Sequence, residues 1–146
     1  MASRMTRGSS LSDEKIIQLI NEKFVAVNLN LSNEDFPSDL KALAPWQKAL
    51  GQVRRKSQPK ERGFSTTVIL TSDAQKVLST SGAGYHTRFK EALNYKPDEY
   101  LDFLREASKR ASDLKTKSRQ KNPKALKDLE IVIEKEIEER NKGYQE

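Results

Sequence analysis

The sequence predicts a single α/β domain followed by an extra C-terminal helix. Apolar residues recur at helical spacing up to residue 24 and then alternate over residues 25–31, which indicates a helix followed by a strand. Two β-rich runs, 66–70 and 76–80, are separated by a short polar stretch, which is typical of a β-hairpin. Two later prolines each open an amphipathic helical segment. Helices and strands are thus expected to alternate along the chain.

The first helix has a clear start. Ser12 is a suitable N-cap, and Asp13 and Glu14 place acidic groups in the first turn, where the helix dipole favours them. In the strand that follows, Val25 and Val27 fall on one face, and asparagines fall on the other. We therefore expect this strand to bury one of its faces.

A second helical stretch is expected from Ser38 to Leu50. Pro45 should kink it or start a second short helix. Trp46 shares its apolar side with leucines and is expected in the core, with a partly exposed binding anchor as the alternative. A basic loop, 52–63, follows and leads into the first strand of the hairpin, which is expected to be buried on both faces.

Pro97 starts the next helix, since proline suits the first helical position and acidic residues follow it. The pattern loses its apolar period after Leu114, so residues 113–123 are predicted to be a basic linker. A charged amphipathic helix is predicted over 124–146, and it packs either on the domain or on a partner. Its apolar stripe consists of Leu126, Leu129, Val132, Ile133 and Ile137.

Three segments in this order resemble the thioredoxin-like superfamily. Residues 19–27 (LINEKFVAV) are similar to its helix and second core strand, 63–78 (GFSTTVILTSDAQKVL) to its central hairpin, and 96–107 (KPDEYLDFLREA) to its closing helix. The resemblance covers about residues 12–112 and implies a three-layer α/β domain, incomplete at its N-terminus, that binds extended polypeptide near the hairpin. Residues 11–112 are then the domain, and 1–10 are a flexible leader.

Two parts of the family's dithiol site are missing. The C-x-x-C motif and the strand that carries it have no counterpart, and Ser65 stands where the family has a cis-proline before the threonine, here Thr66. A cis bond before a residue other than proline costs about 3 kcal/mol, so none is expected there. The missing first strand leaves an edge or groove for residues 1–10, the C-terminal helix or another chain to cover.

Composition excludes several kinds of chemistry. The chain has no cysteine and one histidine, which rules out a thiolate nucleophile, a disulfide, a zinc–thiolate site and a multi-histidine metal site. We therefore expect no enzyme activity, no cofactor and no metal. No apolar run approaches a membrane span and no signal peptide is visible, so a soluble, intracellular, cytoplasmic protein is expected.

The net charge of +6 is concentrated in two blocks. Residues 51–62 carry +4 and residues 105–124 carry +6, while the rest of the chain is neutral or acidic. Such blocks attract acidic partners or nucleic acid, although a charge run is more often a solvated surface. No aromatic nucleic-acid motif accompanies either block, so base stacking has no platform.

The sequence therefore predicts a redox-inactive protein-interaction module that holds an acidic or extended partner. The alternative is a nucleic-acid-associated protein that uses the basic loop 54–62 and the basic segment 109–121. An enzyme with a non-thiol mechanism and a chain whose catalytic cysteines lie further upstream are two other possibilities. The candidate binding residues are Trp46, Arg54, Arg55, Lys56, Arg62, Phe64, Ser65 and Thr66.

Overall fold

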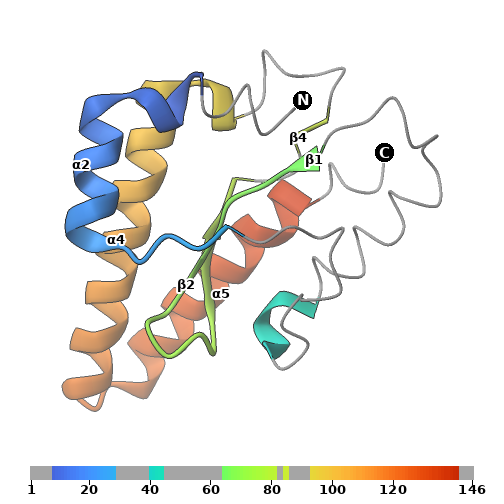
Figure 1. Ribbon diagram of the computed structural model, residues 1–146. Coiled ribbons are helices and arrows are strands. Elements are labelled where there is room, and N and C mark those ends of the chain that lie inside the picture. Colours follow the sequence, from blue (N-terminus) through green and yellow to red (C-terminus); the bar gives the residue numbers. More distant parts are fainter. Residues whose placement is uncertain (1–7, 29–39, 45–63, 82–83, 86–92, 142–146) are drawn as a thin grey trace.

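The computed structural model describes residues 8–28, 40–44, 64–81, 84–85 and 93–141 (Figure 1). Helices and short antiparallel strands are mixed in this part of the chain, as expected for an α/β class protein. The α-helices are α2 (Glu14–Lys23), α4 (Pro97–Arg119) and α5 (Pro123–Asn141). The strands are β1 (Phe64–Ser65), β2 (Val68–Leu70), β3 (Val77–Thr80) and β4 (Gly84–Tyr85), and the 3₁₀ turns are η1 (Ser10–Ser12), η2 (Lys41–Leu43) and η4 (Leu93–Tyr95).

The cap of helix α2 is Asp13, not the predicted Ser12. The Asp13 carboxylate accepts hydrogen bonds from the backbone N–H groups of Lys15 at 2.9 Å and Ile16 at 3.3 Å. Ser12 is the last residue of η1, so the extended residue that precedes the helix is Asp13. An aspartate in this position satisfies free N–H groups and also complements the helix dipole.

The strand predicted over residues 25–31 is not formed where the structure describes it. Residues 25–28 have no strand partner among the described residues, and the side chains of Val25 and Val27 are 92% and 73% exposed. Residues 29–31 lie outside the described part, as does most of the helix predicted over 38–50. Apolar and polar residues do alternate in this segment, but a strand also needs a neighbouring strand to pair with.

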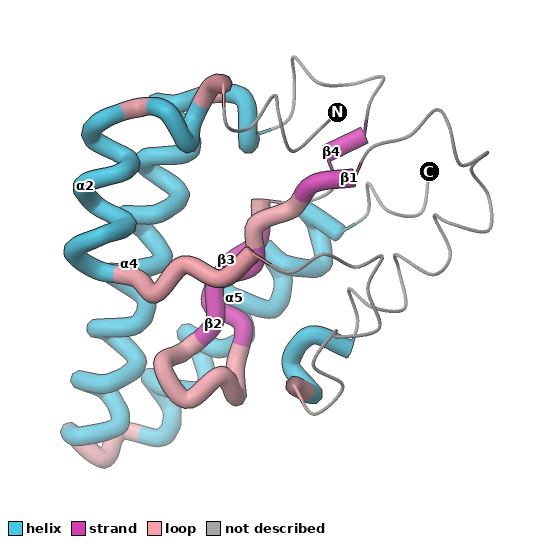
Figure 2. Tube along the Cα trace, viewed as in Figure 1, coloured by secondary structure: helices cyan, strands magenta, loops and turns pink. Residues whose placement is uncertain are grey.

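The predicted hairpin is confirmed. Strands β2 and β3 pair antiparallel, with Ile69 opposite Ser79, and an irregularity between Ile69 and Leu70 lets the turn form (Figure 2). Within the turn, Ala74 adopts a left-handed conformation with φ of 56°, and the carboxylate of Asp73 accepts a hydrogen bond from the Gln75 N–H at 3.1 Å. Strands β1 and β4 form a second, shorter antiparallel pair.

The core lies where the hairpin meets α2 and α4. Its buried members come from all three elements, and partly buried residues such as Phe24 and Leu114 pack around them. The buried members are Ile16, Ile69, Leu78, Tyr100, Leu101, Phe103, Leu104 and Ala107. The start of α4 at Pro97 confirms the prediction from proline and the acidic residues after it.

Most of residues 113–123, which were predicted to form a linker, belong to helix α4 instead. Helix α4 continues to Arg119, and only a tight turn separates it from Pro123, the first residue of α5. Leu114 packs against the core, which holds the helix past the point where the apolar period ends. The basic segment is therefore helical.

Helix α5 packs on its own domain. It contacts β3 and α4, and Ile133 is 4% exposed in this contact (Figure 1). Val132, which was predicted to belong to the apolar stripe, is 55% exposed instead. Of the helices that the structure describes, none has both the length and the apolar character needed to cross a bilayer.

Candidate functional site

Five of the predicted binding residues lie outside the described part of the chain: Trp46, Arg54, Arg55, Lys56 and Arg62. The other three lie together at the base of the hairpin. Phe64 and Ser65 form β1 and pair with Tyr85 and Gly84, and Thr66 is half-buried between β1 and β2. The peptide bond before Ser65 is trans, as predicted, since the described residues contain no cis bond.

Thr67 anchors this base of the hairpin. Its backbone N–H donates to the Ser81 hydroxyl and its C=O accepts from the Ser81 N–H, both at 2.9 Å. Its own hydroxyl lies 2.9 Å from the Tyr100 hydroxyl on α4. Burial raises the pKa of Tyr100, while the hydrogen bond with Thr67 acts in the opposite direction. The phenol therefore stays neutral and serves as a hydrogen-bonding group that ties the hairpin to α4.

Two arginines cover the outer edge of β3. Arg110 of α4 donates from Nη1 to the Leu78 C=O at 3.0 Å, and Arg140 of α5 donates from Nη1 to the Thr80 C=O at 2.8 Å. Arg110 is 6% exposed, so the contact is inside the protein. Unpaired carbonyls on a strand edge attract further strands. These two side chains remove that possibility at β3.

Glu136 links the two arginines. Its carboxylate accepts from Arg110 Nη2 and lies 2.8 Å from Arg140 Nη1. Burial by itself raises the pKa of Glu136, but the Arg110 hydrogen bond and the charges of both arginines outweigh burial and hold the pKa below its ordinary value. The Arg140 guanidinium also lies 5.5 Å from the centre of the Phe103 ring, within cation–π range.

Sequence reasoning missed this network. Arg110 was assigned to the basic surface, although it is buried and ion-paired. One signal was present, because Glu106 and Arg110, like Glu136 and Arg140, are four residues apart on a helix and form ion pairs. The four-residue spacing predicts the ion pairs within each helix, but it does not predict that the two arginines bind carbonyl groups of β3.

The outer edge of β2 differs from that of β3. Backbone groups of successive strand residues point to opposite edges, and Thr67 and Ile69 face β3. Val68 and Leu70 therefore present their N–H and C=O groups to the other edge. Within the part of the chain that the structure describes, these groups have no hydrogen-bond partner.

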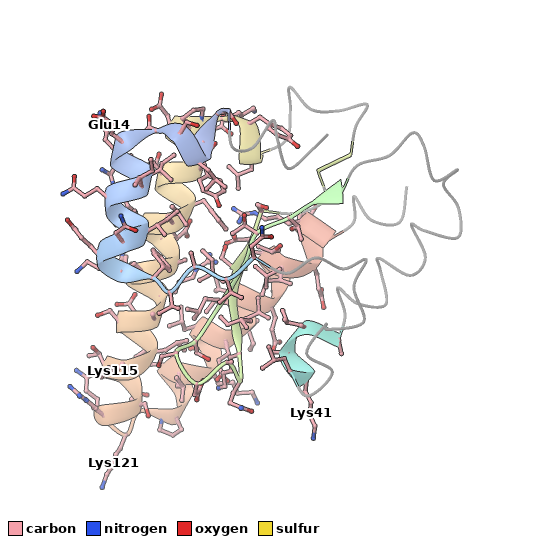
Figure 3. All side chains as sticks on the ribbon, in the orientation of Figure 1. Glu14, Lys41, Lys115 and Lys121 are labelled. Atoms are coloured by element: carbon pink, nitrogen blue, oxygen red, sulfur yellow. The ribbon has the colours of Figure 1, made fainter. Side chains whose placement is uncertain are left out.

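The basic segment forms the end of a helical hairpin. We define the α4–α5 tip as residues 114–127, which contain six basic residues and no acidic one. Figure 3 shows Lys115 and Lys121 pointing away from the rest of the molecule at this end. The six are Lys115, Lys117, Arg119, Lys121, Lys124 and Lys127.

Among the described residues, no other feature suggests a small-molecule or metal site. An open hollow of about 210 Å³ lies between α2 and α4, lined by charged residues such as Lys15 and Arg105 together with Leu19 and Leu101. Ligand pockets are typically larger than this hollow. Among the described residues, no three acidic, histidine or cysteine side chains are grouped so that they could hold a metal ion.

Comparison with known proteins gave no match: no protein-family model, no curated protein and no solved structure is significantly similar to this chain. Function is therefore inferred from the residues of the chain and their geometry.

Proposed function

We propose that this chain is a redox-inactive protein-interaction module of the thioredoxin-like class, which binds an extended polypeptide segment along the outer edge of β2. The observation that carries the proposal is the difference between the two edges of the hairpin. Arg110 and Arg140 cover β3, whereas the outward backbone groups of Val68 and Leu70 have no partner among the described residues.

An added strand matches the hydrogen-bonding groups on this edge. Val68 and Leu70 each offer one N–H and one C=O, which are the groups that pair in a β-ladder. Each such bond contributes about 0.5–1.5 kcal/mol net, so a partner gains several kcal/mol before any side-chain contact. The hairpin is also well anchored for this role, because Thr67 ties it to Tyr100 of α4.

The sequence on either side indicates what kind of segment is preferred. Phe64, Ser65 and Thr66 lead directly into β2, and the basic loop with Arg54, Arg55, Lys56 and Arg62 immediately precedes them in the chain. A partner beside β2 would bind next to residues that follow this basic loop closely in the sequence. Charge complementarity then favours a partner with acidic residues.

The thioredoxin-like class is supported by the sequence resemblance and by the antiparallel hairpin packed under a proline-started helix. A bound polypeptide would lie along the outer edge of β2, whose outward backbone groups have no partner among the described residues. Since the chain contains no cysteine, it would bind the segment without thiol exchange.

The test is a selection of peptides against the full chain, followed by a variant of the edge. A displayed library of acidic and neutral 12-residue peptides supplies the probes. Val68→Pro removes only an outward N–H and leaves the hairpin ladder intact, and Val68→Ala is the matched control for the lost side chain. We expect the proline variant to lose at least tenfold in affinity and the alanine variant to lose much less.

Amide hydrogen exchange on the complex gives an independent measurement. Slower exchange of the Val68 and Leu70 amides on adding a selected peptide supports strand addition. Peptides that bind Val68→Pro and the unchanged chain equally well would refute the proposal, and so would a selection that yields no binder.

A further inference from the structure

We infer that the α4–α5 tip is a surface that binds the phosphate backbone of a nucleic acid without reading its sequence. The tip lies at the end of the molecule where α4 turns into α5, and the structure describes all of its residues (Figure 1). Five of its six basic side chains are exposed, and Lys117 is half-buried.

The charges of the tip are not used inside the protein. Elsewhere on α4 and α5, Arg105 pairs with Asp102, and Arg110 and Arg140 pair with Glu136. Within the same described helices, none of the six tip residues takes part in an ion pair. Their positive charge is therefore available to an external anion.

Helix stability explains only part of this cluster of positive charges. Lys117 and Arg119 lie in the last turn of α4, where the helix dipole favours cations. Lys124 and Lys127 lie at the start of α5, where the dipole favours acidic residues, and the first turn of α5 has none. The spacing of four residues between Lys115 and Arg119 also places like charges together, which is unfavourable.

The surroundings of the charges indicate what kind of anion is bound. No large hydrophobic side chain of residues 114–127 is exposed, so the tip lacks the apolar centre of a typical protein interface. The tip also has no aromatic residue, so it offers no platform for base stacking. Lysine and arginine side chains alone are suited to phosphate groups, and such contacts are independent of sequence.

The test measures binding of the full chain to labelled 20-base-pair duplexes of two unrelated sequences by fluorescence anisotropy. If three or four phosphates are contacted, affinity should fall by about 40- to 150-fold between 50 and 200 mM salt. Both duplexes should bind equally well. The variant K121Q/K124Q/K127Q should bind at least tenfold more weakly and show a smaller salt dependence.

A charge-matched variant separates this surface from the overall charge of the chain. K15Q/K23Q/K41Q also removes three positive charges, but from α2 and η2, which lie away from the tip (Figure 3). It should keep its affinity within about threefold. Equal losses in the two triple variants would overturn the inference, because overall charge alone would then account for binding.

Two other polyanions serve as competitors. Poly-glutamate represents an acidic protein, and vesicles that contain phosphatidylserine represent a membrane surface. If either competes better than the duplex, the tip binds that class instead and the inference is wrong. The Val68→Pro variant should bind duplex normally, so a failure of peptide binding at β2 and a failure of phosphate binding at the tip can be distinguished.

Discussion

Replacing Arg110 with methionine should destabilise the protein much more than the same change at Arg105 of the same helix. Arg110 is 6% exposed, donates to the Leu78 C=O at 3.0 Å and pairs with Glu136. Methionine retains much of the apolar volume but removes all of these donors. Arg105 instead faces Asp102 at 3.6 Å, with both side chains largely exposed.

The size of the effect follows from the contacts. Hydrogen bonds that involve a charged group contribute about 1.5–3 kcal/mol each, and Arg110 makes a buried one to the Leu78 carbonyl and a partly buried one to Glu136. Its third partner, Glu106, is exposed and adds little. Removal of a buried charge returns part of its desolvation cost, and Glu136 keeps Arg140 as a partner. The expected net loss is about 3 kcal/mol.

Urea unfolding followed by circular dichroism measures this difference. With a denaturant dependence of about 1.5 kcal/mol per molar, Arg110→Met should lower the midpoint by about 2 M. Arg105→Met should lower it by less than about 0.7 M, because exposed ion pairs contribute about 0–1 kcal/mol. If the two variants differ by less than about 0.5 kcal/mol, the buried network does not hold α4 and α5 on β3, and the reasoning fails.

Three further predictions concern single side chains. Because the pKa of Glu136 lies below its ordinary value of 4.5, its stabilising effect should be complete above about pH 4.5 and lost as the pH falls through the lower folded-state pKa. Midpoints of urea unfolding from pH 3 to 7 should therefore converge at low pH for the unchanged chain and Glu136→Gln, and parallel curves would contradict this. Ser10 is fully buried and its hydroxyl has no hydrogen-bond partner among the described residues, so Ser10→Ala should raise stability by about 1 kcal/mol in thermal unfolding, and a loss would show that the hydroxyl is bonded. Tyr100→Phe should cost about 1 kcal/mol, because it leaves the Thr67 hydroxyl without its partner on α4, and an unchanged urea midpoint would mean that this bond is not needed to anchor the hairpin.

Local patterns predicted several elements correctly. Pro97 and Pro123 mark the first residues of α4 and α5, because proline already has the backbone angle of a first helical residue and its missing N–H has no role there. The β2–β3 hairpin was recognisable from two β-rich runs around a polar turn. These signals act within a few residues, so they can be read without knowledge of the rest of the fold.

Other elements were predicted incorrectly because their outcome depends on distant residues. Residues 25–28 alternate like a strand but have no strand to pair with in the described part of the chain. Residues 113–119 lose their apolar period, yet they remain helical because Leu114 reaches the core and α5 follows directly after the turn. For the candidate site, the sequence indicated the base of the hairpin at Phe64–Thr66, but it did not indicate the open edge formed by Val68 and Leu70.

The absence of cysteine, the starts of α4 and α5 at their prolines and the basic character of the segment near residue 115 are properties of the sequence by itself. The tertiary structure decided how the charges are used. Arg110 and Lys115 belong to the same basic block, but one is buried against the Leu78 carbonyl and Glu136, while the other is exposed at the tip. The physical reason is that burial and pairing depend on the groups that the fold brings close, here β3 and α5, which are far from α4 in sequence or separated from it by a turn.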